Sequence, residues 1–159
     1  MVFRTAAVAV LAGVTLAVLA RRRWLVVTVR GPSMEPTYVP GDRVLVRRAE
    51  PARLRRGQVV VFQPPGVEGA WDRQPLVAGS VTDRHWYIKR IVAAPSDPLP
   101  QEAAEAAGAP AGTPVPAGKL VLFGDGERSV DSRRWGYVPS DRVLGVVVRR
   151  LAPSSSAPG

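Results

Sequence analysis

The sequence is poor in the residues that most often build reactive sites. Its 159 residues include no cysteine, a single histidine (His85) and only two lysines, Lys89 and Lys119. The absence of cysteine excludes disulfides, thiolate metal sites and cysteine nucleophiles. One histidine cannot build a multi-histidine metal centre. His85 remains a candidate base for a serine protease, but no matching Asp pattern lies near it.

Lysine is rare because arginine carries nearly all of the positive charge, with 20 Arg in the chain. Arginine cannot deprotonate in a protein, whereas lysine can act as a base if burial lowers its pKa from about 10.4. Lys89 lies in an apolar strand beside Tyr87, Ile88, Ile91 and Val92, which predicts a dry setting. Lys89 is therefore a candidate general base. The alternative is a lysine that snorkels from an edge strand.

A candidate nucleophile precedes Lys89 by 56 residues. Ser33 lies in Gly31-Pro32-Ser33-Met34-Glu35-Pro36-Thr37, where two prolines and a glycine predict a tight turn. A serine hydroxyl is a weak nucleophile near pH 7 and needs a neighbouring base to take its proton. Ser33 and Lys89 together supply the two groups of a protease that works without histidine.

The net charge of +9 fits either nucleic acid or an anionic membrane surface as a partner. No zinc-finger spacing, phosphate-binding glycine loop or RNA-binding aromatic signature accompanies the charge. Arginine pairs and triplets are spread along the chain, at 21–23, 47–48, 55–56, 133–134 and 149–150. This spread favours membrane lipid over nucleic acid as the partner.

Residues 5–20 form an uncharged run of small and aliphatic residues between Arg4 and Arg21. Sixteen residues rise about 24 Å as a helix, slightly less than a hydrocarbon core of about 30 Å, and snorkelling arginines extend the reach. We therefore expect one transmembrane helix, a membrane anchor over 1–23. The alternative is a cleavable signal peptide ending at Val18-Leu19-Ala20. The arginine count places the C-terminal side in the cytoplasm.

The rest of the chain predicts a mainly β domain over 24–151, because no later segment shows a sustained helical period. Two loop insertions are expected, at 64–84 and 95–118. The second is rich in Ala, Pro and Gly, a composition that buries no core, with a short helix as an option over 101–107. Residues 152–159 are expected to be a disordered tail. Strands are predicted at 24–29, 42–47, 58–62, 85–93, 119–123 and 142–150.

A third motif follows the strand at 119–123. It reads Gly124-Asp125-Gly126-Glu127-Arg128-Ser129-Val130-Asp131-Ser132-Arg133, which alone is typical of a solvated loop. Together with the Ser33 turn and the Tyr-Ile-Lys-Arg strand, it resembles the bacterial type I signal peptidases, the serine–lysine leader peptidases. The three blocks, about 31–48, 86–97 and 120–145, stand in the order of that family and at comparable separations.

The resemblance implies an antiparallel β-sheet catalytic domain and assigns roles to matching residues. Ser33 attacks the scissile carbonyl and neutral Lys89 takes its proton, while the Ser33 backbone N–H serves the oxyanion. Ser129 hydrogen-bonds and orients the lysine. The other supporting residues are the ion pair of Asp131 with Arg133, and Met34 with Pro36, which shape the turn. No cofactor and no metal are implied.

Three departures from the family pattern stand out. Gly31 occupies the position where many members have a serine that donates its hydroxyl to the oxyanion. Losing one such donor typically costs about 2.7–4 kcal/mol, so a slow enzyme is expected. Gly126 replaces the usual Asn, and the stretch from Gly126 to Ser129 is one residue short. The Ala/Pro segment 95–118 replaces part of the extra domain of larger members.

The resulting hypothesis is a membrane-anchored serine endopeptidase that removes signal peptides from secretory precursor proteins after Ala-x-Ala. The precursor binds as an extended strand along 29–31 or 85–88. The expected location is the cell membrane, single-pass, with an extracytoplasmic catalytic domain, which conflicts with the arginine count. Two alternatives remain open: a dedicated maturation protease for one precursor, possibly cytoplasmic, and a non-catalytic membrane-tethered peptide-binding module.

Overall fold

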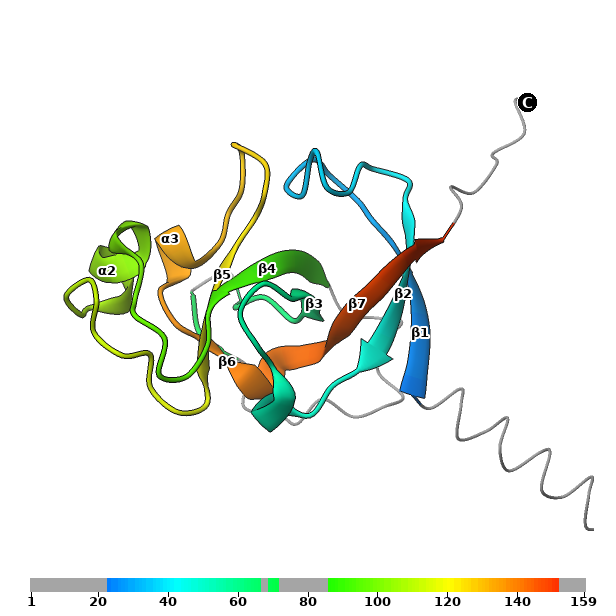
Figure 1. Cartoon of the computed structure of the whole chain (residues 1–159). Coiled ribbons are helices and arrows are strands. Elements are labelled where there is room, and N and C mark those ends of the chain that lie inside the picture. The colour runs from blue at the N-terminus through cyan, green and yellow to red at the C-terminus, as the bar shows by residue number, and fades with distance from the viewer. Residues whose placement is uncertain (1–22, 67–68, 72–85, 152–159) are drawn as a thin grey trace, which may run out of the picture.

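The computed structural model describes residues 23–66, 69–71 and 86–151. A seven-stranded sheet dominates this part of the chain, in the spatial order β1-β2-β7-β3-β4-β5-β6, and each neighbouring pair is antiparallel (Figure 1). The mainly β, antiparallel fold is therefore confirmed. The strands are β1 (Trp24–Thr28), β2 (Arg43–Arg48), β3 (Val59–Phe62), β4 (Tyr87–Ala93), β5 (Lys119–Phe123), β6 (Val138–Pro139) and β7 (Val143–Leu151).

Six of these strands lie where the apolar runs predict them, and their ends differ from the predictions by two residues or fewer. The seventh, β6, was not predicted, nor was the short helix α3 (Ser132–Trp135). Both are too short to show a hydrophobic period in the sequence. Two 3₁₀ turns, η1 (Pro51–Arg53) and η2 (Ser140–Arg142), lead into β3 and β7 respectively.

The core lies on both faces of the central strand β3, whose four residues are all buried. Side chains alternate across a strand, so Val60 and Phe62 enter one apolar cluster and Val59 and Val61 enter another. A strand buried on both faces reads as an unbroken apolar run, as Val-Val-Val-Phe does here. This two-sided core is the rigid support on which β4 and its lysine are placed.

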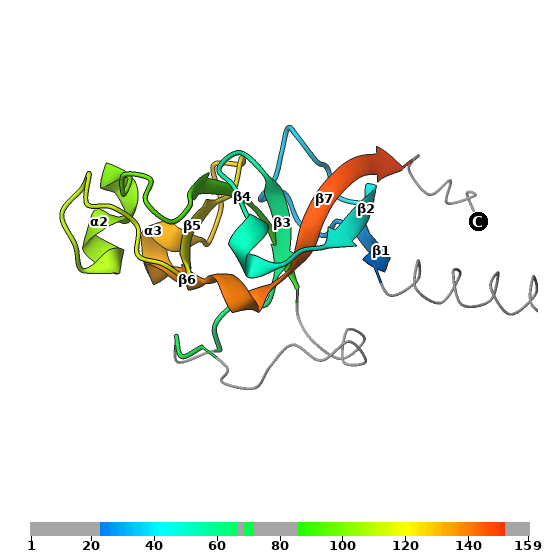
Figure 2. The same ribbon diagram turned by 60° about the horizontal axis from the view of Figure 1, so that its bottom comes forward.

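The prediction that residues 95–118 bury no core is wrong. Leu99, Ala103 and Val115 are at most 2% exposed and pack in a third cluster against β5. The optional helix is confirmed as α2 (Gln101–Ala107), and α2 and α3 lie together at the end of the sheet opposite β1 and β2 (Figures 1 and 2). Three further alanines of the segment, Ala104, Ala107 and Ala109, pack against the same cluster while partly exposed.

Several predictions concern residues outside the described ranges. These are the anchor over 1–23 except for Arg23, most of the loop 64–84, and the tail 152–159. Within the described residues, none of the helices has the length and apolar character needed to span a bilayer.

Candidate active site

Ser33 lies in the loop that connects β1 to β2, and a buried neighbour holds it there. Met34 is 0% exposed and packs in the core with Val29 and Val44, while Ser33 itself stays half-buried. The Met34 carbonyl accepts the Tyr38 N–H at 2.8 Å, which closes the turn. Pro36 follows a cis peptide bond in the same turn. The predicted turn-shaping residues, Met34 and Pro36, therefore lie in the same turn as Ser33, and Met34 anchors that turn in the core.

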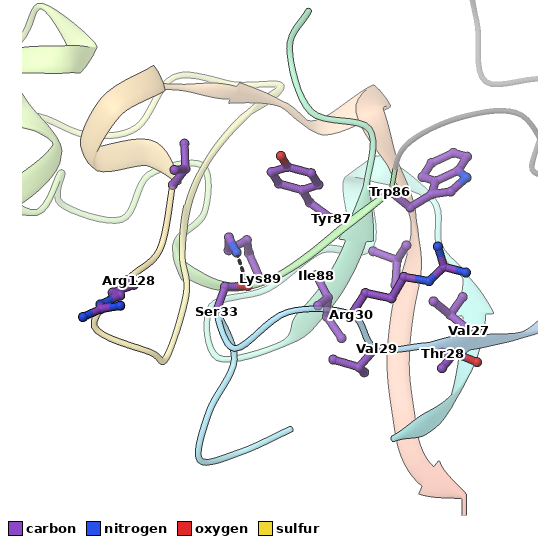
Figure 3. A pocket seen from close by; sticks show the side chains of 12 residues that line it. Val27, Thr28, Val29, Arg30, Ser33, Trp86, Tyr87, Ile88, Lys89 and Arg128 are labelled. Carbon is purple, nitrogen blue, oxygen red and sulfur yellow. Dashed lines mark hydrogen bonds between the residues drawn. The ribbon is translucent and has the colours of Figure 1, made fainter. Parts of the chain in front are cut away.

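The structure brings Lys89 of β4 to Ser33 across 56 residues of sequence. Lys89 Nζ lies 2.6 Å from Ser33 Oγ, which is hydrogen-bond distance (Figure 3). Lys89 is only 2% exposed and pairs in the sheet with Val60 of the central strand. The edge-strand snorkelling alternative does not apply, because the amine points inward. The two predicted catalytic side chains thus meet in the geometry that proton transfer requires.

Burial sets the protonation of this amine. Desolvation lowers the pKa of Lys89 from 10.5 to about 8; nearby Asp131 and Asp125 oppose the shift, and Arg133 reinforces it. The Tyr87 ring lies beside the amine, with Nζ 5.6 Å from its centroid. A lysine whose pKa lies near 8 is neutral in a useful fraction of molecules at physiological pH.

Asp131 and Arg133, predicted as an ion pair, form one. Asp131 is 0% exposed and accepts Arg133 Nε at 3.0 Å, Arg133 Nη2 at 2.7 Å and the Gly124 N–H at 2.9 Å. Burial acts to raise the pKa of Asp131, but these hydrogen bonds outweigh it and leave the pKa below its usual value. The carboxylate therefore ties helix α3 to the end of β5.

Ser129 is part of the same loop, but the hydrogen bond predicted between it and Lys89 is not formed. Its Oγ is buried and makes no hydrogen bond of standard geometry with any described residue, although it is close enough to Asp131 to help lower that carboxyl's pKa. The Lys89 amine is directed at Ser33, whereas the Ser129 hydroxyl lies over Gly124: a methyl group on Gly124 would sit 2.2 Å from Oγ.

Gly126, which replaces the usual Asn of the family, lies where a side chain would clash with the Ser33 turn. The Gly126 N–H donates to the Ser33 carbonyl at 3.1 Å. A methyl group on Gly126 would lie 2.5 Å from the Pro32 carbonyl oxygen, and one on Gly124 would lie 2.4 Å from the Ser33 carbonyl oxygen. Contacts under 3.0 Å at a Cβ cannot be accommodated without movement. Both glycines therefore let the loop after β5 lie directly against the Ser33 turn.

A second ion pair at the site was not predicted. Arg90 holds Asp125 in a bidentate pair, at 2.9 Å for Nε and 2.6 Å for Nη2, and Thr37 Oγ1 donates to the same carboxylate at 2.6 Å. Burial alone would raise the pKa of Asp125, but the Arg90 and Thr37 hydrogen bonds lower it overall. All three residues lie inside the motifs that contain Ser33, Lys89 and Asp131, and this closeness in sequence is the signal that could have identified them.

A cleft of about 400 Å³ opens beside the pair, between β1 and the start of β4 (Figure 3). Its walls are mostly apolar, and three cationic side chains line it. The lining residues are Val27, Thr28, Val29, Arg30, Ser33, Val61, Trp86, Tyr87, Ile88, Lys89, Arg128 and Val130. The cleft has the apolar walls and convergent polar groups typical of a ligand site.

Few hydrogen-bond donors are available next to Ser33 where the family pattern expects an oxyanion to be bound. Gly31 has φ +75° and an exposed backbone, and as glycine it offers no hydroxyl. The Ser33 N–H makes no backbone hydrogen bond with the described residues. Backbone N–H groups without an intramolecular partner are the donors that stabilise an oxyanion in acyl transfer. Among the described residues, no group of three His, Cys, Asp or Glu side chains is placed to hold a metal ion.

Comparison with known proteins places these features in a family. A family model described as "Signal peptidase, peptidase S26" matches residues 2–105 and 99–152. A relative named "Probable signal peptidase I-2" from Synechocystis sp. (strain ATCC 27184 / PCC 6803 / Kazusa) is 30% identical, over 76% of this chain and 60% of the relative. The present chain therefore spans about three fifths of that protein's length.

Two further relatives show similar agreement. "Signal peptidase I" from Leptolyngbya laminosa is 28% identical, over 76% of this chain and 65% of the relative. "Signal peptidase IB" from Staphylococcus aureus (strain COL) is 26% identical, over 80% of this chain and 78% of the relative. The match to the family model covers the Ser33 turn, the Lys89 strand and the loop that contains Asp131.

Proposed function

This chain belongs to the signal peptidase family, peptidase S26, and from that premise we propose that it is a serine endopeptidase that removes signal peptides from exported precursor proteins. The observation that carries the proposal is the 2.6 Å contact between Lys89 Nζ and Ser33 Oγ at a buried amine whose pKa is lowered to about 8. A solvated lysine would be almost wholly protonated near neutral pH and unable to accept a proton. Burial makes it a usable base.

In the proposed reaction, Ser33 Oγ attacks the carbonyl carbon of the scissile bond while neutral Lys89 removes the hydroxyl proton. The C–N bond then breaks, and Lys89 delivers that proton to the leaving amine, which becomes the N-terminus of the mature protein. The signal peptide stays on Ser33 as an ester. Water, deprotonated by the same amine, hydrolyses the ester and restores the Ser33 hydroxyl.

The Ser33 N–H is proposed to stabilise the oxyanion that forms during both steps. One donor of this kind is commonly worth about 2.7–4 kcal/mol of transition-state stabilisation. Since Gly31 supplies no second hydroxyl donor, we expect a lower kcat than a two-donor site would allow. Gly31 has a φ of +75°, in the left-handed region that glycine adopts without strain.

The sheet leaves a slot for an extended substrate beside the catalytic pair. β1 pairs only with β2, so its outer edge is free among the described strands. On β4, pairing with β5 begins at Arg90, which leaves the corresponding edge of residues 87–89 open. A precursor segment that adds as a strand would gain backbone hydrogen bonds here. The apolar wall of Val29, Val61 and Ile88 is proposed to accept the small residues of Ala-x-Ala.

Membrane attachment is part of the proposal and rests on the uncharged run at 5–20. The described domain begins at Arg23, directly after the arginine-flanked segment. Processing of exported precursors requires the catalytic domain on the extracytoplasmic side, opposite to the orientation that the arginine count favours. Protease protection of intact and opened cells, followed with an antibody to the C-terminal domain, distinguishes the two orientations.

The test of activity is cleavage of a secretory precursor with an Ala-x-Ala site by the purified full chain in detergent. We expect cleavage by the native protein and by Lys119→Arg, a matched control at the other lysine. We expect none by Ser33→Ala, Lys89→Arg or Lys89→Met, the last of which fits the dry site without a charge. Cleavage by Ser33→Ala or by either Lys89 variant would contradict the mechanism, and an inactive native protein would contradict the proposed substrate.

A further inference from the structure

The cleft beside Ser33 carries positive charge that the proposed chemistry does not use. Besides Lys89, the proposed base, Arg30 and Arg128 line it, and no carboxylate does among the described lining residues. Arg30 and Arg128 form none of the ion pairs found in the described part of the chain. Glu127 is exposed and adjacent to Arg128 in sequence but does not line the cleft. Two unpaired guanidinium groups are therefore available to a bound peptide.

The two arginines lie at opposite ends of the cleft. In Figure 3, Arg128 is on one side of the Ser33–Lys89 pair and extends away from it, whereas Arg30 lies beyond Ile88 on the other side, toward Trp86. The apolar lining, Val27, Val29 and Ile88, is on the Arg30 side (Figure 3). The catalytic pair thus separates an arm with apolar walls, which also carries Arg30, from an exit at Arg128.

The loop that carries Arg128 is fixed against the nucleophile. Gly126 donates to the Ser33 carbonyl at 3.1 Å, two residues before Arg128. Asp131, three residues after it, is fully buried and bonded to Gly124 and Arg133. With both ends anchored within five residues of each other, the backbone at Arg128 has a set position relative to Ser33, and only the side chain reaches outward.

These placements give the bound peptide a direction, which rests on the proposed function. The small residues of the site precede the cut and belong in the apolar arm. The residues that follow the cut must then leave past Ser33 on the Arg128 side. We propose that Arg128 is a specificity-determining residue that favours precursors with Asp or Glu among the first three residues after the scissile bond, and disfavours Lys or Arg there.

Arg128 is exposed to solvent, which limits the expected size of the preference. An exposed arginine–carboxylate pair contributes little in water, and a like-charge contact costs a similar amount, so the difference between Asp and Lys is about five- to tenfold in kcat/KM at low salt. Because the Debye length shrinks from about 10 Å at 0.1 M salt to about 3 Å at 1 M, the preference should fade at high salt.

The test uses two peptides that share an Ala-x-Ala site and differ only in Asp or Lys at the second residue after the cut. With the full native chain in detergent, we expect the Asp peptide to have the higher kcat/KM by five- to tenfold. Arg128→Ala should bring the ratio close to one, and Arg128→Glu should invert it. Arg134→Glu, an exposed arginine on α3 outside the cleft, makes the same change in net charge and should leave the ratio as in the native protein.

Binding provides a readout that does not depend on turnover. The Ser33→Ala chain should bind the fluorescently labelled Asp peptide more tightly than the Lys peptide by a similar factor, and Arg128→Glu in that background should reverse the order. If the native chain cleaves neither peptide, the proposed function fails, while the binding order still decides the role of Arg128. An Asp/Lys ratio that survives Arg128→Glu, or that changes equally in Arg134→Glu, would overturn the inference.

Discussion

At the scale of single residues, the site depends on what burial does to one amine. Lys89 is 2% exposed and its pKa is lowered from 10.5 to about 8. At pH 7 about one molecule in ten then carries the neutral amine, against about one in 3,000 for a lysine in water. The carboxylates of Asp131 and Asp125 act to raise the pKa of Lys89, so desolvation by the surrounding strands is the main cause of its lowered value.

The pH dependence of cleavage follows from the same shift. A base works only in its neutral form, so kcat/KM should rise about tenfold per pH unit below 8 and level off above about pH 9. The measurement is a pH–rate profile on an Ala-x-Ala peptide without ionisable side chains. Lys119→Ala, which removes the other lysine, should leave the midpoint unchanged. A midpoint near 10.5, or a flat profile from pH 6 to 9, would contradict Lys89 as the base.

At the scale of elements, three separate segments position Ser33 and Lys89, the proposed catalytic pair. The Ser33 turn is anchored by buried Met34, β4 carries Lys89 and Arg90, and the loop after β5 braces both. Asp125 joins them directly, because it accepts hydrogen bonds from Arg90 and from Thr37 of the Ser33 loop. The charged groups around Ser33 and Lys89 thus connect the loops to one another, and they also influence the pKa of Lys89.

A substitution in the bracing loop should act on catalysis through position. In Gly126→Ala the new methyl group meets the Pro32 carbonyl oxygen at 2.5 Å, so the Ser33 turn must move. Because a displacement of about 1 Å at a reacting group costs about 100-fold, we expect kcat/KM to fall by about 10- to 100-fold. The measurement is steady-state cleavage alongside the free energy of unfolding.

The matched control is Gly112→Ala. Gly112 has φ +80°, so alanine there is strained by about 1 kcal/mol or more, but no atom lies within 4 Å of the added methyl group. We expect Gly112→Ala to lose stability and keep its kcat/KM. Equal activity losses in both variants would mean that Gly126 acts through general stability and not by positioning Ser33.

At the scale of the whole molecule, the small segment at the far end of the sheet is part of one folded unit. Leu99, Ala103 and Val115 share an apolar cluster with Ala93 of β4 and Val121 of β5. β4 also carries Lys89, so the cluster packs on the strand that positions the base. A segment rich in Ala, Pro and Gly therefore packs on β4, the strand that carries Lys89.

This coupling can be measured by denaturant unfolding. Leu99 is 2% exposed, so Leu99→Ala should lower the free energy of unfolding by about 2–4 kcal/mol through lost burial and a residual cavity. The loss should appear as one shifted transition, because the cluster shares β4 and β5 with the sheet. Val148→Ala, at a side chain 49% exposed, should change stability by less than about 0.5 kcal/mol. A separate early transition for Leu99→Ala would show that the segment unfolds alone.

The sequence by itself determined the elements whose physics is local. Alternating or unbroken apolar runs placed six of the seven strands, and the prolines and glycines around Ser33 marked its turn. The candidate pair was also evident, because a lysine in an apolar strand is unusual in a chain that otherwise uses arginine. The residues of the ion pair Asp131–Arg133 were identified by the motif that contains them.

Only the tertiary structure decided what depends on contacts between distant segments. Residues 95–118 bury a core because Leu99, Ala103 and Val115 share an apolar cluster with Ala93 of β4 and Val121 of β5, and composition carries no information about that partner surface. Arg90 of β4 pairs in the sheet with Phe123 of β5, which brings it close to Asp125 two residues later, and no local period encodes that pairing. The Ser129 hydroxyl lies over Gly124 and makes no hydrogen bond to Lys89, a placement that depends on how the loop after β5 folds. Local sequence determines which segments form strands and helices, whereas close packing between these segments determines which side chains are in contact.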